Sequence, residues 1–229
     1  AAREQKFGLQ LFHAGPFKEV SRPGTNQYIE DGVESMQIRA DLSLPATVTP
    51  DAWDWVASPQ AGVSRVMLDR DGDEVAVATS FVRYAPDSRF PGHDHARGEE
   101  FIVLEGEFGD EHDRYPRGTY VRNPIGTAHS PRVGPQGCVI FVKLQQFERD
   151  DQAQFATDTS TADFEPGASE GIERLKLHEF GTERVALIRW RTMRSMVVRC
   201  ARFICWFAPS RIPTWKDWMR TISTSFILH

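Results

Sequence analysis

Three histidines and one glutamate lie in a short stretch of the sequence with spacings that suit a metal site. The candidate ligands are His93, His95, Glu99 and His129. His93 and His95 are two residues apart, so on a β-strand both side chains face the same side. Three imidazoles and one carboxylate suit zinc, iron(II), manganese or nickel, and they suit calcium or magnesium poorly. The sequence therefore predicts a site for one of the former metals.

The residues around these candidate ligands form two motifs. Gly106 follows the first three ligands, and Gly118, Pro124 and Gly126 precede His129. These stretches resemble the two motifs of the cupin superfamily, G-x5-H-x-H-x3-4-E-x6-G and G-x5-P-x-G-x2-H-x3-N. Asp87 stands where the first motif opens with Gly, and Val133 stands where the second closes with Asn. Asp also supports a turn, and the closing Asn is not a metal ligand, so the ligand set is retained.

A longer run is similar to the cupin domain of ChrR-type anti-sigma factors and of related stand-alone cupins. It includes Asp54-Trp55, Arg83-Tyr84, Glu99-Glu100, Tyr115-Pro-Arg-Gly118 and Gly137-Cys-Val-Ile-Phe-Val-Lys143. The resemblance covers about residues 33–148 and implies a jelly-roll barrel. It also implies a zinc site with His93, His95, Glu99 and His129 as ligands. Some relatives are iron-dependent dioxygenases that cleave acetylacetone.

Two functions of different class remain open at this point. Four protein ligands complete the usual tetrahedral geometry of zinc, which favours a module that binds or senses a small molecule. The same four ligands around iron(II) or manganese would leave two positions for substrate and dioxygen, as in a dioxygenase acting on a small dicarbonyl-type substrate. Zinc is the metal that we expect, and enzyme activity is left undecided.

Several neighbouring residues have both a functional and a structural interpretation. Tyr84, Phe101, Tyr120 and Phe141 could line a ligand pocket, although aromatic core packing explains them equally well. Arg83 and Arg122 could orient an anionic ligand or be exposed strand residues. Glu100 should point to the strand face opposite Glu99, as a carboxylate at the surface or rim. His112 lies in a solvated turn, and Cys138 is expected to be a small buried hydrophobic residue.

Composition limits the partners. The chain has 229 residues, a net charge of -5 and a pI near 5.8, which argues against general nucleic-acid binding. It has no long apolar run for a membrane span and no apparent signal peptide. Its three cysteines do not form a disulfide framework, and the odd count fits the cytoplasm. The H-x3-C-x2-C motif with which ChrR-type proteins grip a sigma factor is missing, so sigma-factor binding is not carried over.

The elements that would position the ligands read as short strands separated by turns. Residues 74–84 alternate over eleven positions, and Gly and Pro residues break the chain between apolar segments. The other expected strands are 35–44, 62–68, 101–108, 119–122, 127–131 and 138–145. This pattern predicts an all-β protein with an antiparallel sandwich or barrel, and the resemblance specifies the cupin jelly roll.

The rest of the chain divides into three further segments. Residues 1–32 form an N-terminal arm, with a short helix expected near residues 7–12. Residues 149–171 have the composition of a linker. Residues 172–229 begin like a second cupin copy, as in bicupins, with two strands joined at Gly181-Thr182. This copy lacks the histidine pair and the glutamate, so the second unit is partial or degenerate and should not bind metal in the same way.

The C-terminal tail has a different character. From Arg184 onward it contains nine lysine or arginine residues and one acidic residue, together with four of the six tryptophans. Three interpretations compete: a degenerate or altered-frame terminus, a packed extension that covers the barrel or a homodimer partner, and a basic segment for an anionic membrane surface. Trp206, Trp215 and Trp218 would be the anchors in the second interpretation.

Overall fold

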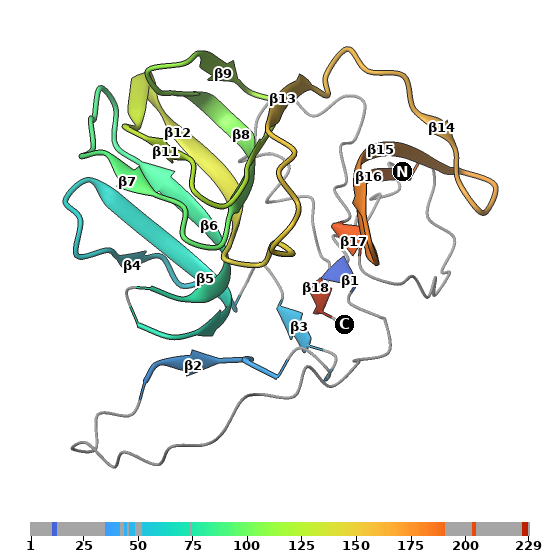
Figure 1. Cartoon of the computed structure of the whole chain (residues 1–229), viewed down its shortest axis with the longest axis horizontal. Coiled ribbons are helices and arrows are strands. Elements are labelled where there is room, and N and C mark those ends of the chain that lie inside the picture. The colour runs from blue at the N-terminus through green and yellow to red at the C-terminus, as the bar shows by residue number, and fades with distance from the viewer. Residues whose placement is uncertain are drawn as a thin grey trace, which may run out of the picture.

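The computed structural model describes residues 11–12, 35–41, 44, 46–48, 52–73, 75–190, 203–204 and 226–228. Within these residues the regular secondary structure consists of β-strands, apart from a single 3₁₀ residue, Ala52 (Figure 1). The main sheet is antiparallel and has nine strands, in the order β13-β10-β8-β12-β6-β5-β2, with β4 paired to β5 and β9 paired to β8. These strands are β2 (Gln37–Ile38), β4 (Val56–Ala57), β5 (Val63–Asp71), β6 (Val77–Tyr84), β8 (Glu99–Gly109), β9 (Arg114–Pro116), β10 (Thr119–Asn123), β12 (Arg132–Leu144) and β13 (Phe155–Asp158).

Four smaller antiparallel sheets accompany the main one. They pair β7 (His93–Asp94) with β11 (Ala128–His129), β1 (Leu11–Phe12) with β17 (Phe203–Ile204), and β3 (Ala46–Val48) with β18 (Phe226–Leu228), and they join β14 (Glu165–Pro166), β15 (Ile172–Phe180) and β16 (Glu183–Trp190). The predicted all-β antiparallel class is confirmed, and β15 and β16 form the expected hairpin around Gly181 and Thr182. The helix expected near residues 7–12 is wrong at Leu11 and Phe12, which form a strand; the rest of it lies outside the described residues.

The alternation of side chains gives the main sheet two apolar faces. One face, which we call the metal face, carries Phe101, Val103, Val121, Ile140 and Val142, together with Phe108, Tyr115 and Cys138. The other, which we call the hairpin face, carries Val66, Leu68, Phe81, Ile102, Leu104, Tyr120, Val139 and Phe141. Full burial of each large side chain contributes about 1.5–3 kcal/mol. Both faces are therefore parts of the hydrophobic core, and Cys138 is buried as expected.

The hairpin face is covered by residues that follow the cupin-like region. Val185 and Leu187 of β16 belong to the same buried cluster, and Phe155 and Phe164 pack against it. The segment 149–171, which the sequence predicts to be a linker, contains β13, and this strand pairs with β10 at the edge of the main sheet. The tail residues Trp206, Trp215 and Trp218 lie outside the described residues. None of the described segments forms a helix long and apolar enough to cross a membrane.

A buried ionic cluster ties the hairpin to the sheet. The guanidinium group of Arg122 is 0% exposed and contacts Glu100 at 3.1 Å, Glu183 of β16 at 2.9 Å and also Asp151. Lys143 lies 3.6 Å from Glu100, and the ring of Phe147 stacks on Arg122 at 3.7 Å. Glu100 does point away from Glu99, but its predicted surface position is wrong. It is only 2% exposed because cations from β10 and β12 meet it beneath the hairpin.

The Arg122 cluster makes a test of stability possible. Arg122→Met should lower the free energy of unfolding by about 3–5 kcal/mol, since the buried carboxylates of Glu100 and Asp151 and the partly buried one of Glu183 lose their shared cation. Denaturant unfolding followed by circular dichroism measures this change. Arg114→Met is the matched control, because Arg114 forms only an exposed pair with Glu107 at 3.6 Å. Equal destabilisation by the two substitutions would contradict this account of the cluster.

Candidate metal centre

Two short strands and the start of β8 bring the four predicted ligands together. His93 of β7 pairs directly with His129 of β11, and Glu99 is the first residue of β8. His95 follows β7, and its backbone N–H donates to the carbonyl of Thr127 at 2.8 Å. The four ligand atoms all lie within 4.8 Å of one another. The spacing seen in the sequence thus becomes a compact group of three imidazoles and one carboxylate.

The atoms that face one another in this group are histidine nitrogens and a carboxylate oxygen, which can offer lone pairs to a metal ion. Nε2 of His129 is 3.2 Å from Nε2 of His93 and 3.7 Å from Oε1 of Glu99, while Nε2 of His95 is 3.5 Å from the same oxygen. Nε2 of His95 is buried and has no hydrogen-bond partner among the described residues. A buried polar atom without a partner is costly. A cation bound at the centre would satisfy it, so these residues fit a metal ion.

Outer hydrogen bonds fix the tautomer of two of the histidines. The Thr127 hydroxyl donates to the carbonyl of Pro124 at 2.7 Å and therefore accepts from Nδ1 of His95 at 2.9 Å. Nδ1 of His129 lies 3.4 Å from a carboxylate oxygen of Asp110. With the proton on Nδ1, each ring directs the lone pair of Nε2 toward the centre. Such partners orient the histidine ligands of metal sites.

Burial sets the protonation states of the group. Burial, and then the neighbouring charges of His129 and His93, lower the pKa of His95 to about 3, while burial and His93 lower the pKa of His129. Burial raises the pKa of Glu99 to about 7, although the Asn123 amide donates a hydrogen bond to its carboxylate at 3.3 Å. Neutral imidazoles are ready to bind a metal, and Glu99 needs a nearby positive charge to ionise fully.

Thr127, Asp110 and Asn123 are functional candidates that the sequence reasoning missed. Thr127 and Asn123 lie within the second cupin-like motif, but their hydrogen bonds to ligands 32 and 24 residues away follow only from the fold. Asp110 precedes His112 in the turn that the sequence predicts to be solvated, but its side chain is 2% exposed because it lies against His129 and Tyr115. His112 is exposed, as expected for that turn.

The structure separates the four aromatic residues predicted for a pocket. Phe101 belongs to the cluster on the metal face, and Tyr84 packs against it, with its ring 5.6 Å from that of Phe108. Phe108 in turn lies 5.8 Å from His129. Tyr120 and Phe141 lie in the cluster on the hairpin face. Only Tyr84 and Phe101 therefore remain pocket candidates beside the metal ligands.

The two arginines considered for an anionic ligand have other contacts. Arg122 is enclosed in the ionic cluster, and Arg83 stacks on Trp55 at 3.7 Å. A second group with metal-ligand spacing, Asp151, His178 and Glu183, surrounds the guanidinium of Arg122. Because Arg122 contacts both carboxylates, this group already has its cation, and we assign it to the stability of the fold.

A family model described as the ChrR cupin-like domain matches residues 44–148. This stretch holds the main-sheet strands β4 to β12 and all four candidate ligands. Residues 44–148 form a ChrR-like cupin domain. The resemblance expected from the motifs is thereby confirmed, and the jelly-roll class with it. No curated protein matches the chain significantly.

Solved structures with partial similarity include cupins of several kinds. The complex of Rhodobacter sphaeroides SigE with the anti-sigma factor ChrR matches with 23% identity over 39% of this chain and 47% of that chain, at a TM-score of 0.34. An acetylacetone dioxygenase from Acinetobacter johnsonii matches with 18% identity over 39% and 66%, at 0.35. A putative dioxygenase from Nostoc punctiforme matches with 16% identity over 59% and 53%, at 0.41. The match thus covers about half the length of the chain in the SigE–ChrR complex.

The hydroxyl of Thr127 provides a test of the ligand orientation. Thr127→Val keeps the shape of the side chain but removes the acceptor for Nδ1 of His95, so metal affinity should fall about 10–100-fold. Competition with a chromophoric chelator measures this affinity. Thr161→Val, at an exposed threonine that donates to Asp158, is the control and should not change it. Unchanged affinity in Thr127→Val would show that this hydrogen bond does not orient the ligand.

Proposed function

We propose that this protein is a metal-binding cupin, with zinc as the metal, that binds or senses a small molecule. The observation that supports it is the convergence of His93, His95, Glu99 and His129, with their ligand atoms within 4.8 Å of one another. A divalent ion at this position would supply the positive counter-charge for the Glu99 carboxylate.

The choice of zinc follows from the number and type of donors. Four protein ligands, three of them imidazoles, complete the tetrahedral coordination that zinc usually has in structural sites. His95, Glu99 and His129 are buried, whereas His93 is exposed, so a small molecule would approach the metal from the side of His93.

The cytoplasmic location, inferred from the odd number of cysteines, stays a prediction, as do a homodimer and the second cupin-like unit.

Removal of one ligand should abolish metal binding. His93→Ala and His129→Ala should each lower the metal content to near zero and destabilise the domain, since the remaining buried donors lose their shared cation. Elemental mass spectrometry on protein purified without chelators measures the metal per chain. The control is His112→Ala, at an exposed histidine in the turn before β9, which should retain the full content. Full occupancy in His93→Ala would remove that residue from the site.

The identity of the metal separates the proposed role from its alternative. One zinc per chain after anaerobic purification is the expected result. Iron or manganese near one per chain would favour instead a dioxygenase that acts on a small dicarbonyl-type substrate, because an octahedral ion leaves two positions open beside four protein ligands. Oxygen uptake with acetylacetone as the probe would then be measured. Protein with no metal at all would contradict both proposals.

A further inference from the structure

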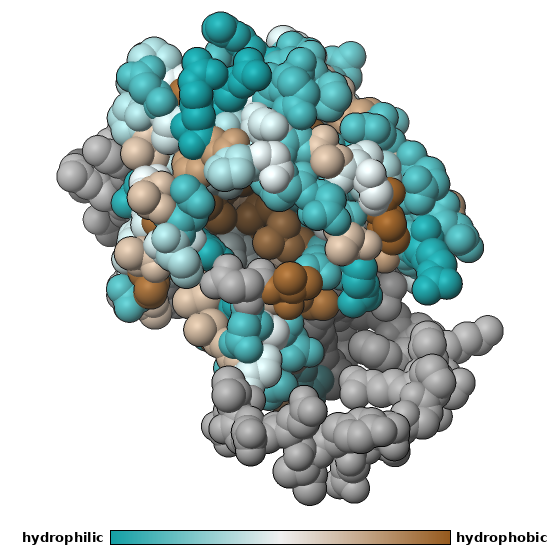
Figure 2. All heavy atoms as spheres, turned by 60° about the vertical axis from the view of Figure 1, so that its left-hand side comes forward, coloured by the Kyte–Doolittle hydropathy of each residue, from teal (hydrophilic) through white to brown (hydrophobic). Residues whose placement is uncertain are grey.

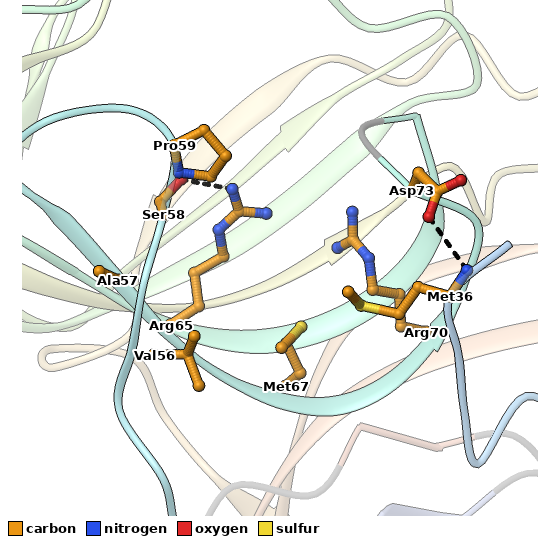
Figure 3. A pocket seen from close by; sticks show the side chains of 9 residues that line it. All are labelled: Met36, Val56, Ala57, Ser58, Pro59, Arg65, Met67, Arg70 and Asp73. Atoms are coloured by element: carbon orange, nitrogen blue, oxygen red, sulfur yellow. Dashed lines mark hydrogen bonds between the residues drawn. The ribbon is translucent and has the colours of Figure 1, made fainter. Parts of the chain in front are cut away.

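A recess lies on the β5 side of the molecule, away from the metal ligands. The face turned forward in Figure 2 is hollowed, with apolar side chains in the hollow and hydrophilic ones around it. The recess by β5 has a volume of about 190 Å³. Figure 3 shows the residues that line it, which come from β5, from β4 and the turn after it, and from the residues beside β2 and after β5. They are Met36, Val56, Ala57, Ser58, Pro59, Arg65, Met67, Arg70 and Asp73.

Arg65 places a positive charge in this largely apolar recess. Its side chain is half-buried, and its guanidinium donates a hydrogen bond to the Ser58 hydroxyl. It forms no ion pair with any described residue, in contrast to Arg122 with its three carboxylates. A partly buried charge whose only partner is a neutral hydroxyl is poorly compensated. The recess therefore offers an anion a site at its Arg65 end.

The two ends of the recess differ in charge. At the end opposite Arg65, Asp73 accepts a hydrogen bond from the backbone N–H of Met36 at 3.0 Å (Figure 3). Arg70 donates to the carbonyl of Gly72 at 2.9 Å. Met67 lies between the two ends, and Val56 lies beside Arg65 (Figure 3). An anionic head group is thus favoured beside Arg65, and an apolar body can lie along Met67 and Val56.

We infer that this recess binds a small carboxylate with a short apolar body, and that Arg65 holds its head group. A guanidinium fork matches the two oxygens of a carboxylate, and such charge-assisted hydrogen bonds are stronger than neutral ones. With a volume of about 190 Å³, the recess has room for a short-chain carboxylate.

The register of the strands places the recess on the metal face of the sheet. Arg70 pairs with Ala78, Ala78 with Leu144, and Leu144 with Glu99. Paired residues point to the same face, so Arg70 and the metal ligand Glu99 share one row. They are three strand spacings apart, or ~14 Å along the sheet. The inferred site therefore goes beyond the proposed metal centre, and it does not depend on which metal is bound there.

Hexanoate is a suitable probe, and hexanamide is its uncharged counterpart. Calorimetric titration of the full chain at low ionic strength should detect binding of hexanoate. The affinity for hexanamide should be lower by about tenfold or more. Arg65→Gln should weaken hexanoate binding about tenfold or more for the same reason. Val56→Trp, at a lining position paired with Arg65, narrows the recess without a change of charge and should also weaken hexanoate binding. The control Arg117→Gln removes an exposed arginine from the turn between β9 and β10 and should leave it unchanged.

The outcomes separate this inference from the proposed function. No binding of hexanoate to the unchanged protein would overturn the inference, and so would equal affinity in Arg65→Gln, since the carboxylate would then bind elsewhere, for example at the metal. If Arg65→Gln does not fold by circular dichroism, Arg65→Lys replaces it, with weaker binding expected because the fork is lost. Zinc measured in the same samples tests the metal site independently: full zinc without hexanoate binding would overturn the inference alone.

Discussion

The two-residue period of β8 is the constraint on which both halves of the structure depend. Glu99 and Glu100 are adjacent in the sequence, so their side chains point to opposite faces of the sheet. Both are buried, at 7% and 2% exposure. A buried carboxylate is costly unless a cation or several hydrogen bonds compensate it. Each face of the sheet must therefore supply a positive charge to its own glutamate.

The two faces meet this requirement in different ways. Glu100 contacts Arg122 and Lys143 and accepts a hydrogen bond from the Tyr120 hydroxyl, all on the hairpin face. Glu99 has only the Asn123 amide and the neutral imidazoles beside it, and its pKa is raised to about 7. The chain provides the counter-charge on one face; on the other face, the proposed metal ion would provide it. Metal binding should on this account be coupled to folding of the domain.

The sequence predicts what is local and misses what the fold brings together. Residues 74–84 alternate cleanly, and the structure has β6 at Val77–Tyr84; likewise the Gly181-Thr182 turn predicts the β15–β16 hairpin. The metal ligands could be proposed because their spacing follows from strand geometry and a turn. The burial of Glu100 could not, since the cluster around it joins Arg122 to Asp151 and Glu183, which lie 29 and 61 residues further along. The composition of residues 149–171 predicts a linker, and the pairing of β13 in this segment with β10 follows only from the fold.

The hairpin after the cupin domain adds burial and charge rather than a second site. Val185 and Leu187 cover the hairpin face, and Glu183 contributes a carboxylate to Arg122. Nε2–H of His178 in the same hairpin donates to the Asp151 carboxylate at 2.7 Å, so its ring is held within the ionic cluster. Since this unit covers the side of the sheet that faces away from Glu99, the metal ligands and the recess beside β5 remain on the side that the hairpin does not cover. A structural role for the hairpin is thus compatible with ligand binding on the opposite face.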